Sequence, residues 1–125
     1  GRNISSIHEF PSTSGFYQSQ YYLIEHVTPV AFFGYILILE GLAANFGPEL
    51  YSKALAAYGA KASSFLKVHS TEDPDHVEKA FVELKNLSPE LEAIVIKNMT
   101  CAQGLYNNML IECASEANQR LFKAA

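Results

Sequence analysis

The sequence of 125 residues has no tryptophan, only two cysteines and only nine lysines and arginines. Thirteen acidic residues outnumber the basic ones and give a net charge of −4 at pH 7, so no basic surface for nucleic acid is expected. The cysteines, Cys101 and Cys113, fall in one predicted helix, where the helical rise separates them by about 18 Å. That distance exceeds the reach of a disulfide bond, so we expect both thiols to be reduced.

Signals for membranes and for several kinds of chemistry are also missing. No segment reaches the roughly 20 consecutive apolar residues that span a bilayer, and no charged and then apolar leader opens the chain. We therefore expect a cytoplasmic protein that does not bind a membrane. The sequence has no glycine-rich phosphate loop, no Ser-His-Asp order, no Cys-x-x-Cys and no internal repeat. Nucleotide binding, serine hydrolysis and dithiol chemistry are therefore not favoured.

Apolar residues are abundant, at 49% of the sequence, which is ample for the core of one domain. Residues 1–11 have no helical period and predict a lead-in loop, whereas residues 12–125 predict a single helical domain. Helices are expected over about 12–27, capped by Ser12 or Ser14, over 29–46, started by Thr28-Pro29 and ended by Gly47-Pro48, and over 49–58, ended by Gly59. Two more are expected, one from about 62 onward with a kink or break at Asp73-Pro74, and one over 89–122, started by Ser88-Pro89 and carrying an apolar stripe from Leu91 to Cys113. Gly34 and Gly41, seven residues apart on one face, are expected to let a neighbouring backbone come close. The fold class is therefore all-α, a bundle of five or six helices.

Two histidines and a carboxylate recur at helical spacing near the middle of the chain. His69, Asp73 and His76 stand four and three residues apart. At about 100° per residue, these three side chains share one face of a helix. Imidazole and carboxylate are ligands of iron, manganese and zinc, and two histidines with one carboxylate form the non-haem iron arrangement. The spacing therefore predicts a metal site.

Glu40 is the fourth candidate ligand. It follows the uncharged run from Val30 to Leu39, in a predicted helix that is apolar on nearly all sides. A carboxylate buried there must be neutral, paired or bound to a metal, because burying it alone costs several kcal/mol. The same residues also fit roles without a metal. Glu40 could form an ion pair or lie near a helix end, Asp73 could cap a helix that restarts at Pro74, and the histidines could be surface residues beside an acidic turn.

These motifs together resemble a known family. The motifs are Tyr22-Leu-Ile-Glu-His26 before Pro29, Gly34-Tyr35, Leu39-Glu40-Gly41, Phe65-Leu and His69-x3-Asp73-x2-His76-Val77. The combination resembles the haem-oxygenase-like di-iron oxidases, or iron-containing redox enzymes, which include the chlamydial protein associating with death domains and share a superfamily with the TenA and PqqC proteins. The resemblance implies a haem-oxygenase-like bundle around iron that activates dioxygen. By motif position, Glu40, His69, Asp73 and His76 would be the ligands, and Mn or Zn would be substitute ions.

The chain also departs from that family's pattern. Family members take a further glutamate and histidine, about seven apart, from a helix well before the one that carries Glu40. Only 39 residues precede Glu40 here, and no Glu-x6-His occurs among them. The chain therefore resembles the C-terminal part of such a protein, with ligands for one ion rather than two. Apolar helix faces that the missing helices would cover predict association, and we expect a homodimer.

Two functions of different classes follow. In the first, the chain is a non-haem iron-dependent oxidase or oxygenase that acts on a small organic substrate with dioxygen, and no acid-base residue can be assigned. In the second, it is a catalytically incomplete module that binds a small molecule or a protein. A metal-free protein of the TenA type, acting on a small heterocycle, is a weaker third possibility, because such proteins have no use for His69-x3-Asp73-x2-His76.

Overall fold

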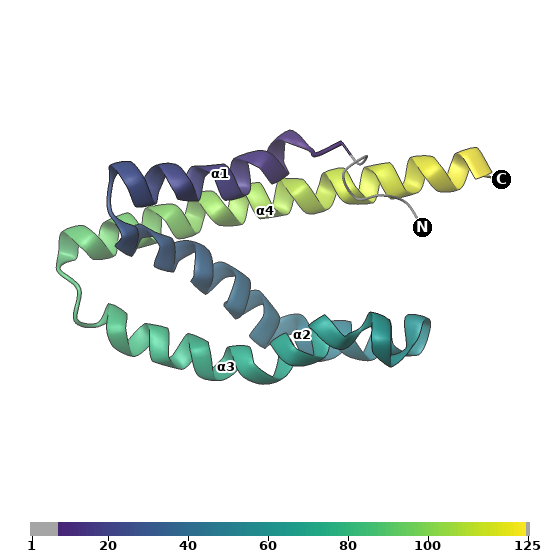
Figure 1. Cartoon of the computed structure of the whole chain (residues 1–125), viewed down its shortest axis with the longest axis horizontal. Coiled ribbons are helices and arrows are strands. Elements are labelled where there is room, and N and C mark those ends of the chain that lie inside the picture. The colour runs from purple at the N-terminus through teal and green to yellow at the C-terminus, as the bar shows by residue number, and fades with distance from the viewer. Residues whose placement is uncertain (1–7, 125) are drawn as a thin grey trace.

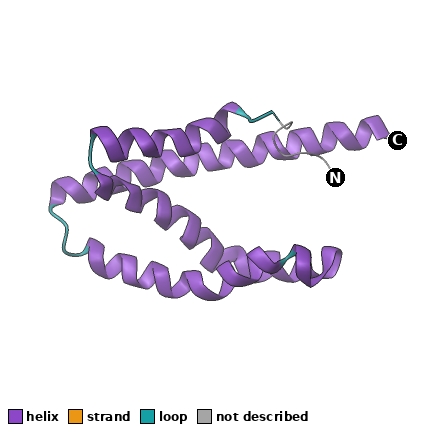
Figure 2. Cartoon of the chain, viewed as in Figure 1, coloured by secondary structure: helices purple, strands orange, loops and turns teal. Residues whose placement is uncertain are grey.

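The computed structural model describes the backbone of residues 8–124 and, within it, all side chains except those of residues 72–75 and 120–124. Its elements are α1 (Pro11–His26), the 3-10 helix η2 (Pro29–Ala31), α2 (Phe32–Ala62), α3 (Ser64–Leu84) and α4 (Pro89–Ala124). Residues 8–124 contain no strand (Figure 2). The expected all-α helical bundle is confirmed.

The helices form two antiparallel pairs that diverge from one end of the molecule (Figure 1). One pair is α1 beside α4, and the other is a hairpin made of α2 and α3. The first half of α2 packs on α4, and its second half continues beside the start of α3. The hairpin therefore projects away from the α1/α4 pair.

A small apolar core lies where α2, α3 and α4 meet. Leu37, Ala80 and Val95 form its buried centre. Partly buried residues surround them, namely Val30, Phe33, Leu84, Leu87 and Met99. On the α1 side, Phe16 is buried against the rings of Tyr35 and Tyr106, at centroid distances of 4.6 and 5.6 Å. Most of the second half of α2 and the first half of α3 lie outside this core.

Three expected helix starts have different outcomes. Thr28 caps η2 as predicted, because its Oγ1 accepts a hydrogen bond from the Val30 N–H at 3.3 Å. Ser88 caps α4 as predicted, accepting from the Leu91 N–H at 3.4 Å. The expectation that Ser12 or Ser14 caps the first helix is wrong. That helix starts at Pro11, whose fixed φ and missing N–H suit the first helical position.

The break expected at Gly47-Pro48 is also wrong, because α2 continues to Ala62 and encloses Pro48. Proline costs about 3 kcal/mol inside a helix, but here α2 packs along α3 on both sides of it. A Cβ on Gly47 would lie 3.1 Å from the Ser70 Cβ, so the two helices touch at this glycine. The expected punctuation at Gly59 is confirmed by its φ of +79°, a conformation that favours glycine.

Of the kink or break expected at Asp73, the break is not present either. The backbone of α3 is helical from Ser64 to Leu84, through Pro74. Packing along α2 again offsets the hydrogen bond that proline removes. The long apolar stripe expected on α4 is confirmed at Val95 and Ala102, which are buried, but not at Cys113, which is exposed together with Cys101.

One described segment, Pro29–Ala62, is long and apolar enough to cross a membrane by length and composition, and 22% of its most apolar window is buried. Core helices of soluble proteins meet the same two criteria. The location of the chain therefore stays a prediction.

Candidate functional site

The register between α2 and α3 determines which of their side chains can meet. Gly47 touches Ser70, and the two helices run in opposite directions. Each step back along α2 therefore corresponds to a step forward along α3. Seven residues before Gly47 is Glu40, and six residues after Ser70 is His76. The close contact at the glycine thus places Glu40 opposite His76.

The side chains of Glu40 and His76 approach each other in this way. Glu40 Oε1 lies 3.7 Å from His76 Nδ1. The Glu40 side chain is only 24% exposed, whereas that of His76 is 50% exposed. The predicted burial of this carboxylate is therefore largely correct, and an imidazole stands beside it. The alternative that Glu40 forms an ion pair is consistent with the same geometry when His76 is protonated.

The separation also suits two ligands of one ion. Zinc and similar divalent metals bind imidazole nitrogen and carboxylate oxygen at about 2.1 Å, so two such donors at a tetrahedral angle stand about 3.4 Å apart. The observed 3.7 Å is close to that separation. The distance between these two atoms is therefore compatible with a shared ion as well as with an ion pair.

His69 does not join this pair. It lies seven residues before His76, which corresponds to about 10.5 Å along the helix axis. Its ring instead packs against Phe65 at a centroid distance of 4.3 Å. Among the described side chains, no three His, Cys, Asp or Glu residues are placed to hold one metal ion. The sequence prediction considers only the direction in which the side chains point around the helix. It does not consider the distance that separates them along the helix axis.

Asp73 is the remaining predicted ligand, and its side chain lies outside the described residues. Its backbone is helical, three residues before His76. Residues three apart are neighbours on a helix surface, so position 73 is one turn from His76. Its role as a ligand stays a prediction.

A shallow aromatic pocket lies elsewhere, between α1 and the start of α2. Its volume is about 220 Å³, and its lining consists of Tyr17, Gln20, Tyr21, Ile24, Phe32 and Tyr35. Burial raises the pKa of the Tyr35 phenol, because desolvation disfavours its ionised form. None of the predicted metal ligands lines this pocket. The sequence pattern predicts only an aromatic helix face here, although the spacing of Tyr17, Tyr21 and Ile24 is the signal that could have indicated a pocket.

Comparisons of the chain with models of protein families, with curated proteins and with solved structures gave no match.

Proposed function

We propose that the α2–α3 hairpin binds a divalent metal ion, with iron as the native ion, and that the chain is a non-haem iron-dependent oxidase. What supports the metal site is the approach of Glu40 to His76, because it pairs a largely buried carboxylate with an imidazole at 3.7 Å. The oxidase activity rests on the sequence motifs that carry these two residues. Asp73 is the third proposed ligand, whereas His69, the fourth residue of the motif, would have to leave Phe65 and move toward the pair to join it.

Each ligand has a distinct place in the proposed site. Glu40 comes from α2 and His76 from α3, so the ion would also tie the two helices together. Asp73 stands one turn before His76, and His69 about two turns before it. Iron bound by imidazole and carboxylate with open positions supplies dioxygen chemistry. The residues of this chain contribute the ligands and a partly dry environment on the α2 side, where Glu40 is 24% exposed.

Metal binding by variants tests the proposed site. We expect the full chain to take up Fe(II) or Zn(II) in a fixed stoichiometry, measured by elemental analysis and calorimetry. Glu40→Gln and His76→Ala should each weaken binding by more than about a hundredfold, since each removes a direct ligand. His69→Ala should have a smaller effect because of its distance along the helix. Binding that is unchanged in both Glu40→Gln and His76→Ala would remove the proposal.

The matched control is a second acid and histidine pair. Glu25 Oε2 and His26 Nε2 lie 3.9 Å apart at the end of α1, but their side chains are 67% and 60% exposed. His26→Ala should leave metal binding unchanged. Oxygen uptake after addition of Fe(II) and a reductant then separates an oxidase from a protein that only binds a structural ion.

A second function, a small-molecule-binding module without catalysis, is favoured by the aromatic pocket. Three tyrosines, a phenylalanine and an isoleucine would contact a planar apolar ligand. We expect a planar aromatic heterocycle such as a pyrimidine to quench tyrosine fluorescence. Tyr21→Ala should weaken this binding, because Tyr21 lines the pocket. Tyr22→Ala should not, and it is a matched control because the two residues are similarly exposed, at 64% and 61%. Equal effects of both substitutions would contradict a ligand in this pocket.

A further inference from the structure

The chain exposes much more surface than a compact monomer of its size. Its accessible surface is 9093 Å² for a mass of 13.8 kDa. A folded monomer of that mass exposes about 6,600 Å² by the usual scaling with mass. The excess of roughly 2,500 Å² is what one subunit contributes to a large obligate dimer interface.

Half of the large apolar side chains that the described residues expose lie on the hairpin of α2 and α3. We call the following set the hairpin surface: Phe46, Leu50, Leu55, Tyr58, Phe65, Val68, Phe81 and Val82. Phe46, Tyr58 and Phe65 are 55%, 78% and 69% exposed. At about 200 Å² per aromatic side chain, these three alone expose roughly 400 Å². The largest apolar patch of a typical monomer covers about 300–600 Å² and is often a binding surface.

Charge is distributed unevenly along the same hairpin. Residues 45–69, which form its tip, contain three lysines and one glutamate, a net charge of +2. Residues 70–85, which form the second half of α3, contain five acidic residues and two lysines, a net charge of −3. Two hairpins in antiparallel arrangement would place the basic tip of each beside the acidic segment of the other. A parallel arrangement would oppose like charges.

We propose that a second copy of this chain covers the hairpin surface, so that two α2–α3 hairpins form an antiparallel four-helix bundle with two-fold symmetry. In this arrangement the tip residues of one copy, such as Phe46 and Phe65, pack against the second half of α3 in the second copy. The symmetry lets one surface serve both partners. Four antiparallel helices around one apolar core are a common bundle architecture. This inference does not depend on the metal site.

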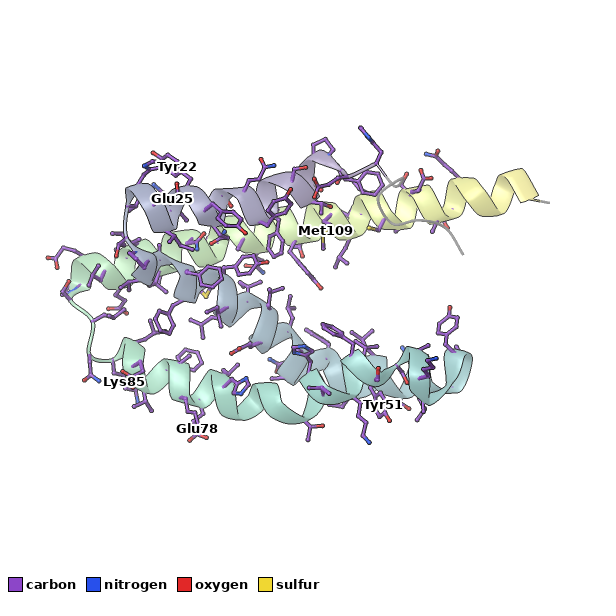
Figure 3. All side chains as sticks on the ribbon, viewed as in Figure 1. Tyr22, Glu25, Tyr51, Glu78, Lys85 and Met109 are labelled. Carbon is purple, nitrogen blue, oxygen red and sulfur yellow. The ribbon has the colours of Figure 1, made fainter. Side chains whose placement is uncertain are left out.

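Sedimentation and light scattering of the full chain test the proposal. We expect a dimer of twice 13.8 kDa. Phe65→Glu should weaken dimerisation at least tenfold, because it would bury an unpaired charge. Ile111→Glu on α4 and Tyr22→Glu on the outer side of α1 are matched controls at 66% and 61% exposure, and both should stay dimeric (Figure 3). A chain that stays monomeric at all protein concentrations would overturn the proposal, and so would a monomer that binds lipid vesicles in a flotation assay.

Charge reversal tests the orientation and does not require the core of the interface to change. Lys67→Glu places an acid in the basic tip, and Glu78→Lys places a base in the acidic segment, where Glu78 projects from the outer side of α3 (Figure 3). Each variant alone should dimerise several times more weakly than the original chain. A mixture of the two should form the mixed dimer in preference to either homodimer. Loss of dimerisation in Ile111→Glu or Tyr22→Glu but not in Phe65→Glu, or no preference for the mixed dimer, would overturn it.

Discussion

Gly34→Ala is expected to destabilise the protein by about 3 kcal/mol or more, because overpacking against backbone atoms has no flexible group to relieve it. A Cβ at this position would lie 2.6 Å from the Met99 backbone nitrogen and would also clash with the Val95 carbonyl oxygen. Both atoms belong to α4, so α2 and α4 would have to separate where the small core lies. Urea unfolding followed by helical circular dichroism measures this loss.

Gly41→Ala is the control, on the same helix seven residues later. A Cβ there meets nothing within 4 Å. Because glycine is a poor helix former, the alanine should stabilise the protein by about 0.5–1 kcal/mol. All variants must be compared at one protein concentration, since dimerisation would shift the transition. Equal effects of the two substitutions would mean that α2 and α4 do not pack closely at Gly34.

The helical class can be predicted from the sequence because its signals are local. Thr28-Pro29 and Ser88-Pro89 start helices where expected, since capping and proline geometry involve only a few neighbouring residues. The prolines at 48 and 74 mislead prediction for the same reason. Their local preference is to break a helix, but contacts between α2 and α3 outweigh it.

The candidate site can be predicted only in part. Glu40 stands out because an acid in an apolar helix needs a partner, and the structure brings His76 to it. Which histidine meets Glu40 depends on the register of two helices, and that register is determined by Gly47 against Ser70. Because Gly47 precedes a proline, its local pattern indicates a helix end rather than a contact between two helices. The sequence therefore gives no signal that distinguishes His69 from His76 as the partner of Glu40. Gly34 and Gly41 both predict close approach of a neighbouring backbone, which is correct for Gly34 and wrong for Gly41.

A buried polar network between α1 and α4 escapes prediction altogether. Asn98 Nδ2 donates to Gln20 Oε1 and to the Ala31 carbonyl, both at 2.7 Å, and Gln20 Nε2 donates to Asn98 Oδ1 at 3.3 Å. Asn98 and Gln20 are each 4% exposed, and Ala31 is fully buried. Its spacing of three residues from Val95 and four from Ala102 places Asn98 within the apolar stripe of α4, but the local sequence does not identify its partners. Its importance depends on partners 67 and 78 residues away.

Asn98→Ala should therefore cost about 2–3 kcal/mol, because a buried group left without a hydrogen bond costs about 1–3 kcal/mol and Gln20 Oε1 would lose its donor. The substitution would also remove one of the bonds to the Ala31 carbonyl, whereas Gln20 Nε2 would keep its bonds to the Phe16 carbonyl and Ser19 Oγ. Asn108→Ala, on the exposed side of α4, should change stability by less than about 0.5 kcal/mol. Urea unfolding measures both.

Combining substitutions at Gln20 and Asn98 distinguishes the contribution of their hydrogen bonds to stability from the effect of lost side-chain volume. Gln20→Leu and Asn98→Leu each leave a buried amide facing an apolar side chain, whereas the double variant removes both amides. The Ala31 carbonyl then loses its bond from Asn98 but, as the N-cap of α2, still accepts the first bond of that helix. The double variant should be less destabilised than the sum of the single ones by at least about 1 kcal/mol. Strictly additive losses of stability would mean that Gln20 and Asn98 do not interact energetically. The junction of α1 and α4 would then depend on their other contacts, such as that of Phe16 with Tyr106.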